Sequence, residues 1–134
     1  MTPEGKVKEK IKKWLGTLGA WTFMPVSNGM GQHGIPDHVA CIPVTITPSM
    51  VGMTIGMFAG IEAKAPDKRN TVSGHQYVQI HRIRRANGLG IVVAGPEDLS
   101  LADSYLERIK LGADRTLIPF PELKIIGKKS HMKL

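Results

Sequence analysis

The strongest constraint on the fold is an apolar strand, a helix and a second apolar strand that follow one another in the middle of the chain. Residues 53–64 stay apolar until the charges at their end, and they predict a strand that bends near Gly56 or Gly60. A helix is expected over residues 73–87, with Ser73 as its N-cap. Residues 89–94 form a short apolar strand of the type that is buried on both faces. Two strands joined through a helix pair in parallel with a right-handed crossover.

Further elements are expected on both sides of this motif. After Pro3, apolar residues recur at helical spacing, with Thr2 as the N-cap, and Gly19 ends the helix. The other expected elements are strands over 21–26 and 37–44, a connection over 45–52 and a helix over 96–111. The sequence therefore predicts an α/β fold in a single domain, residues 1–134, with a core over about 2–111 and a basic tail over 127–134.

The overall charge favours a polyanionic partner. The chain has 134 residues, a formal net charge of +7 and a sequence pI of about 9.8, and a basic balance of this size favours nucleic acid. A basic protein without such a partner is the alternative that charge alone leaves open. Cys41 is the single cysteine, residues 6–13 are rich in lysine where a signal peptide would be apolar, and no apolar run reaches about 20 residues. We therefore expect a cytoplasmic protein that does not enter a membrane.

The residues that carry chemistry are Asp37 and the strand end Glu62-Ala63-Lys64. Glu62 and Lys64 are two apart on a strand, so both side chains leave the same face. If the two predicted strands form a hairpin with paired ends, Asp37 lies beside Glu62. The two carboxylates and the Ala63 carbonyl would then hold a hard cation such as Mg²⁺. Such a cation activates a water molecule for attack on a phosphate, with Lys64 orienting the water or stabilising the developing charge.

Each of these residues also has a purely structural interpretation. An aspartate after a proline is usually a turn residue or a cap, and a Glu-x-Lys at a strand end is usually solvated. An aspartate after Gly-Ile-Pro, followed by two apolar strands of which the second ends in Glu-x-Lys, is much rarer by chance. This combination favours the catalytic interpretation.

Together these motifs resemble the VRR-NUC family, the virus-type replication-repair branch of the PD-(D/E)xK nucleases. The matching segments are Gly-Ile-Pro-Asp at 34–37, Ile-Glu-Ala-Lys-Ala-Pro at 61–66, Gln76 on the following helix, and the glycine-ended helix and apolar strand over 86–93; the opening residues 3–8 resemble phage members. The resemblance implies a restriction-endonuclease-like core, in which a mixed central sheet of roughly four strands is flanked by helices. The stretch between residues 41 and 57 is longer than the family pattern. Asn87-Gly88 replaces its Gly-Gly pair, which a helix C-cap tolerates.

The resemblance also implies an activity and a set of site residues. Asp37 and Glu62 would bind metal, Lys64 would be catalytic, Gln76 would support the site and Glu4 would complete it. The implied function is that of a Mg²⁺- or Mn²⁺-dependent DNA endonuclease, phage-encoded and acting in the bacterial host, structure-selective on branched or four-way-junction DNA in repair. The alternatives are a non-selective DNA nuclease, a catalytically silent DNA-binding module of the same fold, and a viral scaffolding protein whose basic face binds RNA or lipid.

Basic residues around the expected site are the predicted DNA contacts. They are His33 in the glycine-rich loop and, near the two ends of the helix over 73–87, Lys68, Arg69, Arg82, Arg84 and Arg85. A solvated face explains the lysine and the arginines equally well, and an exposed loop histidine explains His33 better. Zinc binding by His33, His38 and Cys41 is disfavoured, since no fourth ligand is evident.

The resemblance and one neutral stretch predict a two-fold homodimer. Symmetric cutting of a four-way junction needs two active sites, which a C₂ dimer of this single-domain chain supplies. Residues 41–61 contain no charged side chain. A hairpin that is this apolar must be covered by its own core or by a partner. The alternative is that its apolar side chains fill the core of the monomer.

Overall fold

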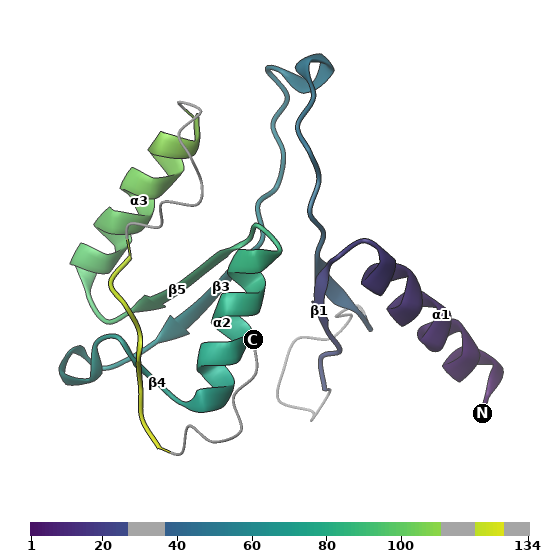
Figure 1. The fold of residues 1–134 in the computed structure, drawn as a ribbon, viewed down its shortest axis with the longest axis horizontal. Helices are drawn as coiled ribbons and strands as arrows, with labels where there is room; N and C mark the ends of the chain where they lie inside the picture. Colours follow the sequence, from purple (N-terminus) through teal and green to yellow (C-terminus); the bar gives the residue numbers. More distant parts are fainter. Residues whose placement is uncertain (27–36, 111–119, 128–134) are drawn as a thin grey trace. The chain divides into compact units, whose positions relative to one another are not determined.

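The computed structural model of the chain describes residues 1–26, 37–110 and 120–127, and Figure 1 draws them as a ribbon. The described residues hold three α-helices together with small parallel and antiparallel sheets, which confirms the predicted α/β class at this level. The chain divides into two compact units, residues 1–58 with 85–88 and residues 59–84 with 89–134. None of the helices in the described ranges is long and apolar enough to cross a membrane.

The first unit begins with a helix that is followed by an antiparallel strand pair. Its elements are α1 (Pro3–Thr17), β1 (Trp21–Phe23), β2 (Val39–Cys41) and the 3₁₀ turn η1 (Pro48–Met50). Thr2 caps α1 as predicted, because its hydroxyl accepts a hydrogen bond from Gly5 N at 3.0 Å. Gly19 follows the end of the helix with a φ of 68°. β1 and β2 pair over three residues each, so both are shorter than the predicted strands.

Residues 42–58 form an arm with η1 at its tip (Figure 1). Within the described part of the chain, the arm joins no strand ladder, and Pro43 and Pro48 lack the N–H donors that a ladder needs. Apolar side chains of the arm are between 37% and 81% exposed: Val44, Ile46, Val51, Met53, Ile55 and Met57. Within the first unit these side chains therefore do not form a buried core.

The described strands form three two-stranded sheets, and the single mixed central sheet of roughly four strands stays a prediction. β2 pairs with β1, whereas the predicted hairpin partner of β2 was the strand over residues 53–64. Only the second half of that segment is a strand, and it pairs elsewhere. The prolines of the arm cannot continue a ladder, so residues 42–58 extend neither strand.

The second unit is built on the predicted strand–helix–strand motif. Its elements are β3 (Ala59–Ala63), η2 (Pro66–Lys68), β4 (Thr71–Val72), α2 (Gly74–Arg85), β5 (Leu89–Val93), α3 (Pro96–Lys110) and β6 (Lys124–Ile125). β3 and β5 pair in parallel over their five residues, which confirms the predicted parallel pair. Asn87, which follows α2, has a φ of 68°, so this asparagine adopts the left-handed conformation that the predicted C-cap requires.

Two glycines lie side by side in the β3–β5 pair and allow α2 to pack closely. Gly60 lies opposite Gly90 in the ladder. A Cβ added at Gly90 would lie 2.8 Å from the Ile80 carbonyl oxygen, and one added at Gly60 would lie 2.6 Å from Cδ1 of Ile83. Of the two predicted places for the bend, Gly56 or Gly60, Gly60 is therefore wrong, because this glycine sits in a regular ladder and provides room for the helix.

A C-terminal strand completes the second unit beyond the predicted core. β6 pairs in parallel with β4. Next to this pair, Leu123 is 7% exposed and packs with Val72, which is fully buried, and with Val92. The sequence alone does not reveal this strand, because two residues carry no periodic pattern. Residues 120–125 therefore belong to the folded unit.

The packing around Gly60 and Gly90 predicts how alanine at each position changes the stability of the protein. Gly90→Ala should lower the free energy of unfolding by about 1–3 kcal/mol, because a methyl group would overpack against a backbone oxygen. Gly60→Ala should cost less, since the end of the Ile83 side chain can rotate away. Urea unfolding followed by circular dichroism measures both changes.

Gly16→Ala in α1 is the matched control for these two variants. A Cβ at Gly16 would meet no atom within 4 Å, so alanine should stabilise the helix by roughly 0.5–1 kcal/mol. A Gly90→Ala variant as stable as the wild type would contradict the close packing of α2.

Candidate functional site

A reciprocal pair of hydrogen bonds between Ser73 and Gln76 closes the N-terminus of α2. Ser73 Oγ accepts a hydrogen bond from Gln76 N at 3.2 Å, and Gln76 Oε1 accepts one from Ser73 N at 3.0 Å. This is a capping box, in which serine at the N-cap and glutamine three residues later each satisfy a backbone donor near the helix start. The box confirms Ser73 as the N-cap and fixes the Gln76 side chain in the first turn.

The same glutamine side chain joins the two charged residues at the end of β3. Gln76 Oε1 accepts a second hydrogen bond from Lys64 Nζ at 3.0 Å, and Gln76 Nε2 donates to Glu62 Oε1 at 2.9 Å. Two donors face the amide oxygen and a carboxylate faces the amide nitrogen, so this orientation of the amide satisfies all three partners. Glu62, Lys64 and Gln76 form one hydrogen-bonded unit, the Gln76 cluster.

The strand ladder places the two charged residues of the cluster on one face. Glu62 and Lys64 flank the exposed Ala63, as predicted for residues two apart on a strand. Lys64 N donates to the Val93 carbonyl oxygen at 2.9 Å, so the backbone pairing continues as far as the lysine. Gly60 lies on the same face, beneath α2. The close approach of the helix therefore lets its first turn reach the strand end.

The Gln76 cluster is charged and partly buried. The side chains of Lys64 and Glu62 are 19% and 37% exposed, and Lys64 Nζ lies 4.0 Å from Glu62 Oε1. Partial burial strengthens the attraction between such charges relative to water. The exposed part of both side chains keeps them accessible to a ligand. The cluster can therefore bind a cation through the carboxylate and an anion through the ammonium at neighbouring positions.

A hard divalent cation fits the oxygen chemistry of Glu62 but needs further ligands. Within the ranges that the structure describes, no group of three metal-ligating side chains occurs. Ala63, the predicted source of a carbonyl ligand, is the strand neighbour of Glu62. Asp37 belongs to the first unit and Glu62 to the second, so their predicted pairing stays a prediction.

The predicted roles of Glu4 and His33 also stay predictions. Glu4 belongs to the first unit and lies in the first turn of α1. Its side chain is 74% exposed, and its Oε1 lies 3.7 Å from Lys8 Nζ. The helix dipole favours an acidic residue at this place, which accounts for Glu4 without a catalytic role. His33 lies outside the described residues.

Arg69, a predicted DNA contact, is held by the start of α3. It forms ion pairs with Glu97 and, at 3.0 Å, with Asp98. Asp98 is 6% exposed and also accepts a hydrogen bond from Ala94 N at 2.8 Å. A buried carboxylate needs such partners. Arg69 therefore neutralises Asp98 and ties the loop after β3 to α3.

Arg84, a second predicted DNA contact, also has internal partners. Its Nε donates to the Gly90 carbonyl oxygen at 2.8 Å, and its guanidinium lies 5.6 Å from the centroid of the Phe120 ring. Burial lowers the pKa of Arg84 from its ordinary value, and the nearby Tyr105 and Tyr77 oppose this shift. Arg84 therefore fastens α2 to β5. The remaining predicted contacts are exposed: Lys68, Arg82 and Arg85.

One contact and one residue that shape this region were not recognised from the sequence. The contact is the reciprocal bond of the predicted N-cap Ser73 with Gln76, for which the spacing Ser-x-x-Gln was an available signal. The other is Asp98, whose partners Arg69 and Ala94 lie outside its own helix. No local pattern indicates such a buried carboxylate.

Comparison of the chain with known proteins identifies no family for it. No protein-family model matches it, and neither the curated proteins nor the solved structures give a match. The resemblance to the VRR-NUC family therefore rests on the motifs of the sequence alone.

The capping box predicts a measurable contribution to stability. Ser73→Ala should lower the free energy of unfolding by about 1 kcal/mol, because Gln76 N loses its acceptor at the helix start. Ser100→Ala is the matched control: Ser100 lies inside α3, is exposed, and donates only to the carbonyl oxygen of its own helix at Pro96. That exchange should change stability by less than about 0.5 kcal/mol. Urea unfolding compares the two, and equal losses would contradict the special role of Ser73.

Proposed function

We propose that the protein is a Mg²⁺- or Mn²⁺-dependent DNA endonuclease whose active site is the Gln76 cluster. The observation that carries the proposal is the bridging of Glu62 and Lys64 by Gln76, through hydrogen bonds of 2.9 and 3.0 Å. A carboxylate and an ammonium fixed by one amide offer a cation site and an anion site within reach of one phosphate group. Membership of the VRR-NUC family, a restriction-endonuclease-like fold and a phage-encoded role in the host cytoplasm belong to the same proposal, and the motifs support them.

The proposed metal ligands are oxygen atoms, as Mg²⁺ and Mn²⁺ prefer. They are the carboxylates of Glu62 and Asp37 and the carbonyl of Ala63. Bound there, the cation would lower the pKa of a water molecule and neutralise charge on the phosphoryl group. Gln76 holds Oε1 of Glu62, and this hydrogen bond restricts the rotation of the carboxylate. The glutamine therefore orients a ligand without being one.

Lys64 is the proposed group that stabilises negative charge on the phosphate. An ammonium carries three donors, and the bond to Gln76 uses one of them. The side chain is 19% exposed, so it works in a partly water-excluded environment, where a fixed charge stabilises a developing one more strongly. The bond to Gln76 fixes the ammonium before substrate binds, which reduces the reorganisation that the reaction requires.

Substitution of Lys64 tests this role directly. Lys64→Ala should reduce DNA cleavage in Mn²⁺ by about 10²–10³-fold or more, because the charge-stabilising group is removed. Binding to DNA, measured in Ca²⁺ where cleavage is not expected, should survive. Lys124→Ala removes the same charge from an exposed position of β6 and should cleave like the wild type. Circular dichroism verifies that both variants are folded.

The same experiment separates the competing functions when the substrates are four-way-junction, flapped and linear duplex DNA. Wild-type activity in the folded Lys64→Ala variant would reject the site. Binding without cleavage of any substrate by the wild type would favour the catalytically silent DNA-binding module. Equal rates on linear and junction DNA would leave a nuclease but reject its selectivity for branched DNA.

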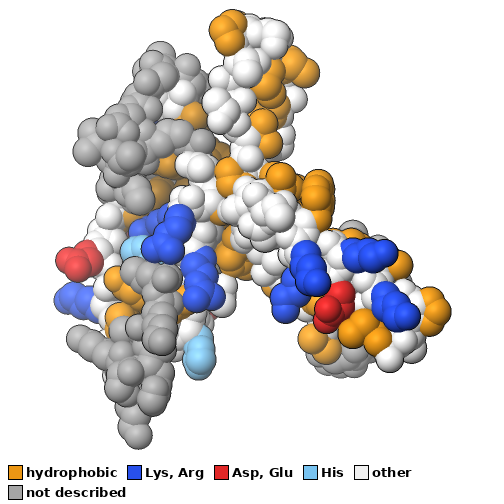
Figure 2. All heavy atoms as spheres, turned by 45° about the vertical axis from the view of Figure 1, so that its right-hand side comes forward, with side chains coloured by type: hydrophobic (Ala, Val, Ile, Leu, Met, Phe, Trp, Pro, Cys, Tyr) orange, Lys and Arg blue, Asp and Glu red, His pale blue; other side chains and the backbone are white. Residues whose placement is uncertain are grey.

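We also propose that two copies of the chain associate through the arm, residues 42–58. The arm carries no charged side chain, although the chain as a whole has a net charge of +7, so two copies can approach there with the least repulsion. Figure 2 shows the arm with hydrophobic side chains on its surface and with no blue or red side chain. An exposed apolar surface of this kind favours a partner. A two-fold dimer would supply two active sites for a branched substrate.

A charge placed in the arm tests the dimer. Light scattering on the wild type should give twice the 14.6 kDa mass of the chain, and Ile46→Asp should give the mass of one chain, because a carboxylate cannot be buried at an apolar contact without a partner. Leu99→Asp is the control at 52% exposure, close to the 55% of Ile46, and should remain dimeric. A wild type that has the mass of one chain at micromolar concentration rejects the proposal.

A further inference from the structure

The chain forms a closed loop between Lys64 and Gln76. The two ends of this loop are joined by the hydrogen bond from Lys64 Nζ to Gln76 Oε1 at 3.0 Å. The loop contains η2 and β4, and it leads into α2 through the N-cap Ser73. The conformation of the loop therefore decides where the first turn of α2 lies relative to the end of β3, and with it the distance between Gln76 and Lys64.

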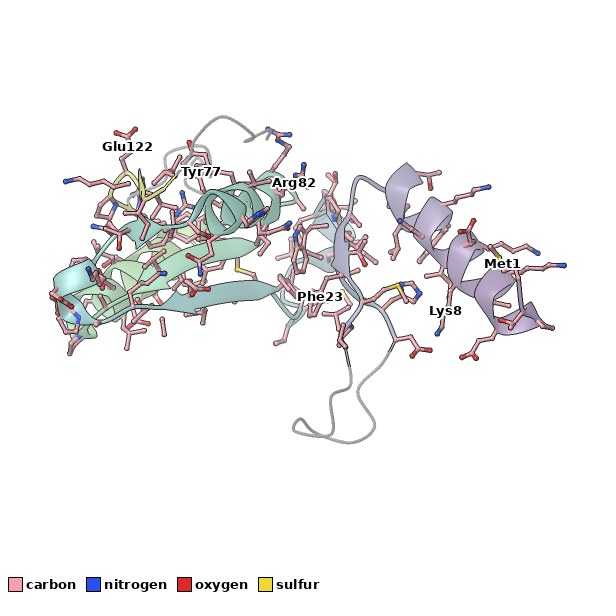
Figure 3. All side chains as sticks on the ribbon, turned by 90° about the horizontal axis from the view of Figure 1, so that it is seen from below. Met1, Lys8, Phe23, Tyr77, Arg82 and Glu122 are labelled. Atoms are coloured by element: carbon pink, nitrogen blue, oxygen red, sulfur yellow. The ribbon has the colours of Figure 1, made fainter. Side chains whose placement is uncertain are left out.

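The second half of the loop is held by the C-terminal segment. β4 pairs in parallel with β6. Val72 of β4 packs in a buried cluster with Leu123, and Tyr77 of α2 packs against the same cluster. Figure 3 shows Tyr77 and Glu122, the residue before Leu123, on the same side of the second unit. The part of the loop that leads directly into α2 is therefore fixed by strand pairing and apolar packing.

The first half of the loop is held through Arg69. Its Nη1 donates to Asp98 Oδ1 at 3.0 Å, and the second oxygen of this carboxylate, Oδ2, accepts a hydrogen bond from Ala94 N at 2.8 Å. Ala94 follows Val93, whose carbonyl oxygen accepts a hydrogen bond from Lys64 N at 2.9 Å. The carboxylate of Asp98 therefore connects the middle of the loop to the end of β5, directly beside the point where β5 holds Lys64.

Asp98 is the buried partner of Arg69. Asp98 is 6% exposed, whereas the side chain of Glu97, which also pairs with Arg69, is 63% exposed. An exposed ion pair contributes little to stability, but a buried carboxylate that loses its partner costs several kcal/mol, about 3–5. A Cβ added at Gly95 would lie 2.9 Å from Arg69 Nη2, so the guanidinium lies against the backbone between β5 and α3. Asp98 therefore fixes Arg69 more firmly than Glu97 does.

We propose that Asp98 is a positioning residue for the Gln76 cluster and that it acts through Arg69. This inference rests on the proposed nuclease function and gives Arg69 a positioning role in it in place of a contact with DNA. The ion pair between Arg69 and Asp98 holds the first half of the loop against β5, so that Lys64 and Glu62 keep their hydrogen bonds to Gln76 when a substrate binds. Without the pair, this half of the loop can move, and Lys64 loses its fixed distance from Gln76.

The first measurement does not depend on cleavage and follows the side-chain amide of Gln76 by NMR. Asp98→Asn keeps the shape of the side chain, but the new amide nitrogen is a donor and must face Arg69 or Ala94 N, which are donors as well. The ¹H–¹⁵N resonance of the Gln76 side chain, identified by its absence in Gln76→Ala, should therefore shift. Asp103→Asn makes the same exchange at an exposed position of α3 and should leave this resonance in place.

The second measurement separates kcat from KM for DNA cleavage in Mn²⁺. Asp98→Asn and Arg69→Ala should each lower kcat by about 10²-fold, the loss expected for a misplacement of about 1 Å, and should leave KM nearly unchanged. The double variant should lose no more than the more severe single variant, because both exchanges remove the same ion pair. Asp103→Asn should cleave like the wild type. Circular dichroism verifies the fold, and Arg69→Ala carries both measurements if Asp98→Asn does not fold.

The outcomes separate the positioning role from the nuclease function. An unshifted Gln76 resonance in the folded variant overturns the positioning role, whether or not the protein cleaves DNA. Losses of kcat that add in the double variant also overturn it. So does a slope of log K against log salt for DNA binding in Ca²⁺ that becomes shallower by about 0.9 in Arg69→Ala, because Arg69 would then contact a phosphate. A shifted resonance in a protein that never cleaves DNA supports the coupling of Asp98 to Gln76 and overturns the proposed nuclease.

Discussion

α2 can lie close against β3 and β5 only because two paired glycines face it. A side chain at Gly90 would collide with the Ile80 backbone, and one at Gly60 would require the end of the Ile83 side chain to move. A side chain at Gly90 would force the helix outward, and Gln76 in its first turn would move with it. The hydrogen bonds from Gln76 to Glu62 and Lys64, at 2.9 and 3.0 Å, depend on this approach. Backbone packing in the second unit therefore sets the geometry of the candidate site.

Gln76 couples the start of a helix to the orientation of two charged side chains. Its amide oxygen serves Ser73 N and Lys64, and its amide nitrogen serves Glu62. The loop that leads to this turn is held from two sides, by the pairing of β4 with β6 and by the ion pairs of Arg69. A partly buried polar network of this kind is stable when every member has a partner. The site is therefore preorganised by the same contacts that fold the unit.

The described residues carry two surfaces of different chemistry. The surface of α2 is basic, because the helix itself contains no acidic residue, and a basic surface suits a phosphate backbone. The arm is neutral and apolar, which suits a second protein surface. Charge alone, a net +7 for the chain, does not distinguish them. The arginines of α2 also differ in burial, since Arg84 is partly buried and Arg82 is exposed.

The sequence by itself determined the three helices, the parallel strand pair and the shared face of Glu62 and Lys64, because caps, periodicity and the alternation of a strand are local. It also indicated Gln76 as a site residue through the motif resemblance, although not its double role in the capping box. Only the tertiary structure decided which basic residues are buried, that residues 124–125 form a strand, and that the arm does not extend a sheet. These features depend on partners far away in the chain: Asp98 for Arg69, Phe120 for Arg84 and Thr71 for Lys124. A short segment carries no signal for such contacts, because its conformation is selected by packing and not by its own propensity.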